Sequence, residues 1–325
     1  MFADAAKQHG QRVEIAAAIC TYQRYDLLPD AIASLLQQSV APARYRIIVV
    51  DNSPDAAASM QWSRRWSGEP NLLWLHERTA GLANARNVAT EAANAPIVAF
   101  IDDDAVASPD WLAALSQAFQ RLGPAAQIVG GRVRPRFGAP RPAWLDDKLQ
   151  SYLSVCDLGE ETRFLQPGEW VVGVNIAYRT EALRKAGGFN TALGRVGSGA
   201  ALMSNDETEV QDRIEAGGGR TAYTPDAEVE HFIPAERLTQ EWFRRRMAWQ
   251  AVSDYVRAPQ RMRAGAAESW LRLKDYLASC SPADRTMRAL VLPQAEAGPF
   301  TFQMSAVYET MVALLGHAET EAELD

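Results

Sequence analysis

The sequence is poor in cysteine and contains no long apolar run. Its 325 residues include three cysteines, Cys20, Cys156 and Cys280, which are widely separated and form no Cys-x-x-Cys pair. This usage is typical of reduced thiols and argues against a disulfide framework. No apolar stretch approaches the ~20 residues that a membrane-spanning helix needs, and the polar residues 1–13 do not resemble a signal peptide. These absences predict a cytoplasmic protein.

Negative charge outnumbers positive charge, with 40 Asp and Glu residues against 33 Lys and Arg. The formal net charge is -7, which argues against a nucleic-acid partner. The chain also lacks a GxxxxGK[ST] phosphate-binding loop, and no GxGxxG follows its first predicted strand, so kinases and dehydrogenases lose support. An acidic protein that handles phosphates would need a metal ion or a local basic pocket.

In its first half, the sequence alternates short apolar runs, which are typical of strands, with segments of helical spacing. Strands are predicted at 13–19, 45–50, 72–75 and 96–101, and helices at 27–36, 60–66 and 80–93. This order predicts an α/β fold with a doubly wound, mostly parallel sheet and right-handed crossovers.

The second half is less regular. Strands are predicted at 128–133, 170–178, 222–223 and 229–231, helices at 180–186 and 205–216, and loops at 134–142 and 194–199. From residue 238 the chain looks helical. We therefore predict an N-terminal tail (1–12), a nucleotide-binding and catalytic domain (13–235) and a C-terminal helical extension (236–325).

The most informative segment is PIVAFIDDDAVASPDWL, residues 96–112. A buried strand runs directly into Asp102, Asp103 and Asp104. Carboxylates crowded at a strand end repel one another unless a cation lies among them, and ligands of open α/β sheets bind at the carboxyl ends of strands. A divalent cation is one interpretation. The alternative is that these aspartates cap the next helix and face water.

Three further polar groups follow predicted strands: Thr21-Tyr22, Asp51-Asn52-Ser53 and His231. Each alone could be a helix cap, a turn or a packed side chain. Because successive parallel strands present their carboxyl ends at one edge, the groups together predict a site for a cation and a nucleotide.

A second acidic cluster contains Asp206 and Glu207 and follows the glycine-rich segment 194–199. First-turn carboxylates interact favourably with the helix dipole, and this accounts for some of them. A carboxylate that begins a rigid helix beside a movable loop also suits a general base under a lid.

These segments, taken in order, resemble those of an inverting, family 2 glycosyltransferase with the GT-A fold. The matching stretches are ICTYQRYDLLPDAIASLLQQ, IIVVDNSPD, GLANARNVATEAANAPIVAFIDDDAVASPDWL, VVGVNIAYRTEALRKAGGFN and NDETEVQDRIEAGGGRTAYTPDAEVEHF. They cover roughly residues 13–232, so the resemblance does not set the role of the C-terminal region.

The resemblance implies a role for each matching residue. The nucleotide-sugar donor, expected to be UDP-linked, would be bound by Thr21, Tyr22, Arg24, Asp51, Arg86, Asp102, Asp103 and Asn175. Asp104 would bind a divalent cation, Mn²⁺ or Mg²⁺, with His231 in the metal shell. Glu207 would be the catalytic base and Asp206 the reserve candidate. The implied acceptor is a hydroxyl of a glycan, a lipid-linked sugar or another molecule, in glycan or polysaccharide biosynthesis.

Several alternatives stay open on the sequence alone. A sugar-nucleotide nucleotidyltransferase or a non-catalytic nucleotide- or sugar-binding protein could share the fold. The C-terminal region is predicted to be a cap over the acceptor pocket. Its second interpretation is a reversible contact with the inner membrane surface through Arg244, Arg245 and Arg246 beside Trp242, Trp249 and Trp270. The oligomeric state cannot be read from the sequence.

Overall fold

The computed structural model describes residues 13–197 and 201–317. The predicted tail 1–12, the end of the glycine-rich segment 194–199 and the last residues of the C-terminal region lie outside this range. The described residues form a mixed sheet of nine strands, of which eight follow the order β3-β2-β1-β4-β8-β6-β9-β5, while β7 pairs with β9.

The first half of the sheet is parallel. Its strands are β1 (Ile15–Thr21), β2 (Tyr45–Asp51), β3 (Leu72–His76) and β4 (Ile97–Asp102). Strands β1, β2 and β4 are almost entirely buried, as expected of strands that are covered on both faces. The predicted alternation of strand and helix is confirmed.

The second half of the sheet mixes parallel and antiparallel pairs. Its strands are β5 (Ala105–Ala107), β6 (Ala126–Phe137), β7 (Arg163–Phe164), β8 (Asn175–Arg179) and β9 (Arg220–Ile233). Strand β8 joins the two halves through antiparallel pairs with β4 and β6, and β6 then runs parallel to β9.

The prolines misled the strand predictions here. Strand β6 continues to Phe137 through Pro135, where a loop was predicted. On the edge opposite β9, β8 pairs with Ile128, Val129 and Gly130 and Cys156 bridges Val133, and no described strand pairs with Pro135 there. Strand β9 likewise runs through Pro225, with a register shift in its pairing to β6 at this point.

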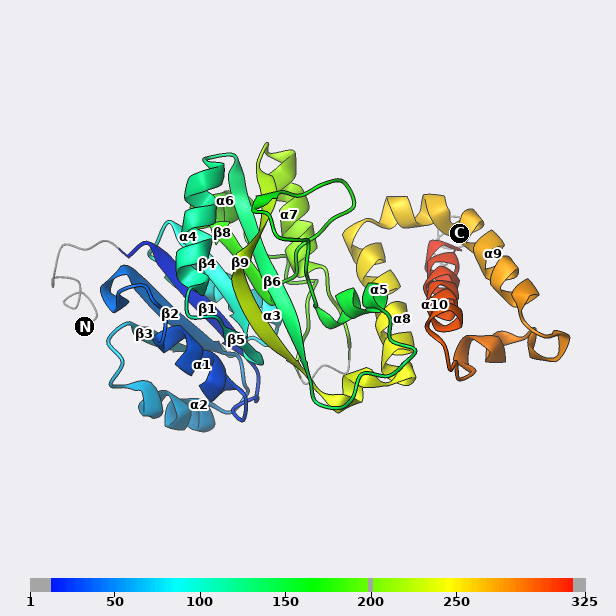
Figure 1. Cartoon of the computed structure of the whole chain (residues 1–325), viewed down its shortest axis with the longest axis horizontal. Helices are drawn as coiled ribbons and strands as arrows, with labels where there is room; N and C mark the ends of the chain where they lie inside the picture. Colours follow the sequence, from blue (N-terminus) through cyan, green and yellow to red (C-terminus); the bar gives the residue numbers. More distant parts are fainter. Residues whose placement is uncertain (1–12, 198–200, 318–325) are drawn as a thin grey trace, which may run out of the picture.

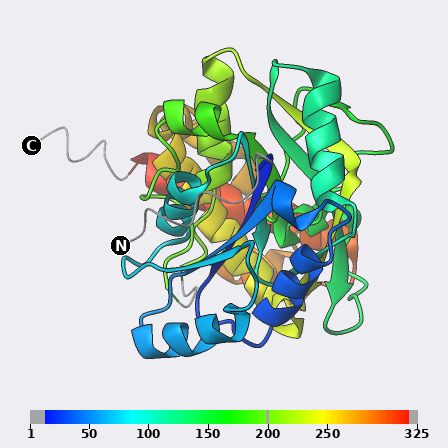
Figure 2. The ribbon, with the colours of Figure 1, turned by 90° about the vertical axis from the view of Figure 1, so that its left-hand side faces the viewer.

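The helices lie on both faces of the sheet. Figures 1 and 2 show α1 and α4 on one face and α3, α6 and α7 on the other. The bounds are α1 (Leu28–Leu36), α2 (Ala56–Ser63), α3 (Leu82–Ala92), α4 (Trp111–Leu122), α5 (Asp147–Gln150), α6 (Thr180–Lys185) and α7 (Asp206–Ala216). Helix α2 begins before the predicted residue 60 because the Asp55 side chain caps it, accepting hydrogen bonds from the amides of Ala57 and Ala58.

The C-terminal region is helical, as predicted. Its long helices are α8 (Gln240–Arg257), α9 (Pro259–Ser279) and α10 (Ala297–His317), which lie to one side of the sheet in Figure 1 and behind it in Figure 2. Helices α8 and α10 share an apolar cluster with Leu145 and Leu149, so residues before 236 contribute to this second core. None of the described helices combines the length and the apolarity needed to cross a lipid bilayer.

The arginine run in α8 does not form one outward patch. Arg244 donates hydrogen bonds to Gln303 and to the carbonyl of Leu292, and Arg246 lies in a pocket described below. Trp242 packs against Phe243 beside the apolar cluster, whereas Trp270 is 45% exposed. Membrane contact through this run stays a prediction, and the inward arginines weigh against it.

Candidate functional site

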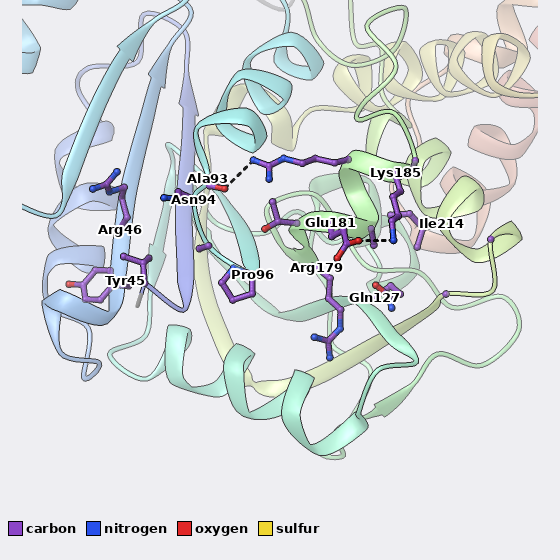
Figure 3. A pocket seen from close by; sticks show the side chains of 18 of the residues that line it. Tyr45, Arg46, Ala93, Asn94, Pro96, Gln127, Arg179, Glu181, Lys185 and Ile214 are labelled. Atoms are coloured by element: carbon purple, nitrogen blue, oxygen red, sulfur yellow. Dashed lines mark hydrogen bonds and ion pairs between the residues drawn. The ribbon is translucent and has the colours of Figure 1, made fainter. Parts of the chain in front are cut away.

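Two large cavities flank the sheet. The larger, about 1480 Å³, lies at the amino ends of the strands and is lined by Arg46, Arg179 and Lys185 among others. Two of these cations are engaged by the protein: Lys185 pairs with Glu181, as Figure 3 shows, and Arg179 donates to the carbonyls of Ala126 and Gly123. Among the described residues, its lining contains no cluster of three histidine, cysteine or carboxylate side chains.

The second cavity, about 930 Å³, lies at the carboxyl ends of β1 and β4. The sheet register brings its groups together, because Thr21 pairs with Asp51 and Cys20 with Asp102. Helices α8 and α10 form the opposite wall. Of the predicted residues, Thr21, Tyr22, Arg24, Arg86, Asp102, Asp103, Asp104, Asp206, Glu207 and His231 line this pocket.

Asp104 is a buried carboxylate of the pocket that contacts both Arg24 and His231. Its Oδ2 accepts a hydrogen bond of 2.7 Å from Arg24, and its Oδ1 lies 3.4 Å from Nε2 of His231, which the pairing of β5 with β9 places beside it. Burial alone would raise the pKa of Asp104, but His231 and Arg24 outweigh burial and hold the pKa well below its usual range. Asp104 is thus ionised at neutral pH.

The surroundings of Asp104 fit a divalent cation. Its Oδ1 is buried and has no hydrogen-bond partner, which is costly unless a ligand supplies one. Among the described residues, no three histidine, cysteine or carboxylate side chains form a closed metal cage. Asp104 and His231 would thus supply only part of a coordination shell, and Mg²⁺ or Mn²⁺ commonly takes its remaining ligands from water and substrate phosphates.

Asp103 lies beside Asp104 but is held differently. Its Oδ2 accepts a hydrogen bond of 2.7 Å from the Thr21 hydroxyl, and its Oδ1 lies 3.4 Å from Arg24. Burial and the charge of Asp104 raise the pKa of Asp103 to about 7. Near neutral pH, Asp103 is therefore partly protonated, so the two neighbouring carboxylates do not both carry a full negative charge.

A second acidic pair faces the pocket from α7. Asp206 is buried and forms an ion pair of 2.5 Å with Arg86 of α3, which also donates to the carbonyl of Gly173. The Glu207 side chain is 22% exposed against 3% for Asp206. Burial and the charge of Asp206 raise the pKa of Glu207 to about 7. Glu207 can therefore accept a proton near neutral pH, and it is the more exposed of the two carboxylates.

The C-terminal helices fix the start of α7. Asn205 precedes the helix with φ of 71°, a left-handed conformation that asparagine tolerates better than most residues. Its side chain donates to Asp254 of α8 at 2.7 Å and accepts from Gln250 at 3.1 Å. Asp254 also accepts from Tyr308 of α10. Helices α8 and α10 therefore position Asp206 and Glu207.

Two predicted donor-binding residues lie outside the pocket wall. Asp51 is fully buried, and its carboxylate accepts hydrogen bonds from the Tyr25 hydroxyl and the Ser53 amide. Asn175 is also fully buried, and its amide is saturated by Trp111 and by the carbonyls of Arg132 and Ala227. The hydrogen bonds of Asp51 hold the loop after β2. Those of Asn175 link β8 to α4, β6 and β9 at the centre of the sheet. A direct contact of either residue with a ligand would require them to break.

The segment before β8 also differs from prediction. A strand was predicted from residue 170, but β8 begins at Asn175, and residues 172–174 instead line the pocket. Gly173 lies close to Arg86 in this segment, and a Cβ there would lie 2.7 Å from Nη2 of Arg86. The chain bends to bring the Gly173 carbonyl to this buried guanidinium.

The comparisons with known proteins decide the family. The family model described as glycosyl transferase family 2 matches residues 17–187, just over half of the chain. The chain belongs to glycosyl transferase family 2. Asp206, Glu207, His231 and all of the C-terminal helices lie beyond the matched segment.

Two curated relatives cover most of this family 2 enzyme. A glucosyl-dolichyl phosphate glucuronosyltransferase of Haloferax volcanii is 28% identical over 249 residues, which is 75% of this chain and 77% of the relative. The succinoglycan biosynthesis protein ExoM of Rhizobium meliloti is 28% identical over 240 residues, or 73% and 72% of the two chains.

Solved structures share the fold. A mannosyltransferase of Pyrobaculum calidifontis in complex with GDP-Man and Mn²⁺ aligns with a TM-score of 0.58 at 20% identity, covering 97% of this chain and 88% of that one. TarS of S. aureus in complex with UDP aligns with a TM-score of 0.52 at 15% identity, covering 95% and 92%. These likenesses confirm the GT-A-type α/β fold of the transferase.

Sequence reasoning missed three arginines in the pocket wall of the transferase. Arg195 precedes α7, Arg237 lies in the turn Ala235–Leu238, and Arg246 belongs to α8. The run of arginines at 244–246 was noticed, but helical spacing could not show which of them faces the pocket.

The buried ion pair between Arg86 and Asp206 links the site to the stability of the folded transferase. Arg86→Leu should lower the free energy of unfolding by about 3–5 kcal/mol, because it leaves Asp206 buried without a cation. Urea denaturation measures this loss. The double variant Arg86→Leu/Asp206→Leu should recover part of it, and Lys185→Met in the exposed pair with Glu181 should leave the midpoint unchanged. A single-variant loss below ~1 kcal/mol would contradict this role.

Proposed function

We propose that this family 2 glycosyltransferase moves a sugar from a nucleoside diphosphate donor, with UDP as the expected nucleotide, to a hydroxyl acceptor with inversion at the anomeric carbon. The observation that carries the proposal is the buried Oδ1 of Asp104, which accepts no hydrogen bond and lies 3.4 Å from His231, while Arg24 binds Oδ2. This arrangement suits a divalent cation, Mn²⁺ or Mg²⁺, with a diphosphate as its further ligand.

The pocket residues divide the work between leaving group and acceptor. A cation held by Asp104 and His231 would neutralise negative charge on the departing diphosphate. Arg24, 32% exposed and within 2.7 Å of Asp104, can add a hydrogen bond to the same phosphates. Glu207 removes the proton of the acceptor hydroxyl as that oxygen attacks from the opposite face of the sugar ring, so a single displacement inverts the configuration.

The relatives support the direction of this proposal. The solved mannosyltransferase carries GDP-Man and Mn²⁺, and a TarS structure carries UDP. The curated relatives act on a dolichyl phosphate-linked glucose or belong to succinoglycan biosynthesis, by their names. We accordingly propose a glycan or lipid-linked sugar as the acceptor. Membrane contact of the C-terminal helices stays a prediction.

A thermal-shift panel tests the donor and the metal together. UDP, GDP and the matching nucleotide-sugars are added with Mn²⁺ or with EDTA. A ligand at 100 times its Kd stabilises the native state by about 2.7 kcal/mol, so the bound nucleotide should raise Tm clearly when Mn²⁺ is present and much less with EDTA. A larger shift with GDP would correct the nucleotide. No shift with any nucleotide would contradict the proposal.

A further inference from the structure

Three pocket cations are not explained by the donor site alone. Arg195, Arg237 and Arg246 all line the cavity. Among the described residues, neither Arg195 nor Arg237 has an ion pair or hydrogen bond to a carboxylate. A cluster of guanidinium groups in a partly desolvated pocket is unfavourable until an anion binds there.

The three arginines span two ends of the pocket. Arg237 lies in the turn Ala235–Leu238 directly after β9, the strand that carries His231, so it belongs to the end proposed for the cation and diphosphate. Arg246 lies beside the start of α7, at the other end, because its Nη2 donates to the hydroxyl of Ser204, three residues before Glu207. Arg195 lines the same cavity, and its charge acts on both Arg237 and Arg246.

Arg246 is held ready to bind. Its Nη2 donates to Oε1 of Gln250 at 2.8 Å and to the Ser204 hydroxyl at 3.2 Å. Its Nη1 is buried and has no hydrogen-bond partner. Burial and the neighbouring charge of Arg195 lower the pKa of Arg246 to about 10, because both disfavour its charged form. A fixed guanidinium with a spare donor is well suited to a phosphate or carboxylate oxygen.

We propose that Arg246, assisted by Arg195, binds an anionic group, a phosphate or a carboxylate, carried by the acceptor near the hydroxyl that receives the sugar. This inference rests on the proposed function, because Glu207 marks the acceptor side. It narrows the acceptor to an acidic glycan or a sugar phosphate and excludes a neutral sugar as the preferred substrate.

Binding of small probes tests the proposal on the full chain. Glucose 1-phosphate, glucuronic acid and the neutral methyl α-glucoside are titrated calorimetrically, with and without saturating UDP and Mn²⁺. At least one anionic probe should bind about 10-fold more tightly than the neutral one, the effect of a single charge-assisted hydrogen bond. Arg246→Gln should remove this preference, and Arg246→Lys should keep part of it because the charge remains. The two anionic probes distinguish phosphate from carboxylate.

The matched control is Arg245→Gln, which removes an exposed guanidinium from the neighbouring position of the same helix and should leave all probes unchanged. UDP binding with Mn²⁺ should also be unchanged in Arg246→Gln. Equal affinity of the wild type for charged and neutral probes would overturn the proposal. So would an equal loss of all probes in Arg246→Gln, which would assign it a positioning role through Ser204 and Gln250.

Two further results would overturn the proposal by giving Arg246 a different ligand. Weakened UDP binding in Arg246→Gln would make it a diphosphate ligand. A changed preference between UDP-glucose and UDP-glucuronic acid, with acceptor probes unaffected, would place the anion on the donor sugar. Absence of UDP binding in the wild type would instead contradict the proposed function, while the probe titrations without nucleotide still report on Arg246.

Discussion

Glu207→Gln is expected to slow sugar transfer by at least ~100-fold, the lower end of general-base effects, while donor binding remains normal. Glutamine keeps the size of the side chain and removes only its ability to accept the acceptor proton. Asp206 cannot easily substitute, because its carboxylate is buried and committed to Arg86. Steady-state kinetics should therefore show the loss in kcat, with little change in the Kd for UDP.

The pH profile identifies the base independently. Burial and Asp206 raise the pKa of Glu207 to about 7, and the base must be ionised to act. For the wild type, kcat/KM should thus fall as pH drops through about 7, and Glu207→Gln should lack this limb. The control is Glu209→Gln on the same helix, whose carboxylate binds Arg213. Near-normal turnover of Glu207→Gln would move the base elsewhere.

Asp104→Asn is expected to reduce transfer by roughly 10²–10³-fold or more, the size of losing one electrostatic contact to the transition state. The change keeps the shape of the side chain but removes the charge that would hold the cation. The Mn²⁺-dependent part of the thermal shift by UDP should disappear with it, and both losses are measured on the same purified variant.

The control for Asp104→Asn lies in the same segment. Asp110→Asn makes the same chemical change at an exposed carboxylate before α4, whose side chain forms no cap hydrogen bond. It should retain transfer and the metal-dependent shift. Unimpaired transfer by Asp104→Asn, with the Mn²⁺ effect intact, would remove Asp104 from the metal site.

The position of the pocket could be predicted from the sequence because it follows from strand order. Thr21 and Asp102–Asp104 each follow a buried run, and parallel neighbours bring such ends to one edge. His231 was harder to place. It reaches Asp104 only through the antiparallel pairing of the short strand β5 with β9, which the hydrophobic pattern does not encode.

The hydrogen bonds of polar side chains could not be predicted. Asp51 and Asn175 follow or begin a strand like the residues that line the pocket, yet tertiary partners such as Tyr25 and Trp111 occupy them. Arg246 is the reverse case: it lines the pocket although no role in the site was predicted for it. Its neighbour on the same helix, Arg245, is exposed. Such outcomes depend on long-range packing rather than on local sequence.

The hydrogen bond between Asn205 and Asp254 couples the choice of acceptor to the placement of the proposed catalytic base. The wall that would choose the acceptor is built from α8 and α10, and the same helices anchor the residue on which α7 begins. A chimera that imports another member's C-terminal helices would therefore disturb proton removal along with substrate choice. Redesign of specificity must keep Asn205, Asp254 and Tyr308 as one transplanted unit.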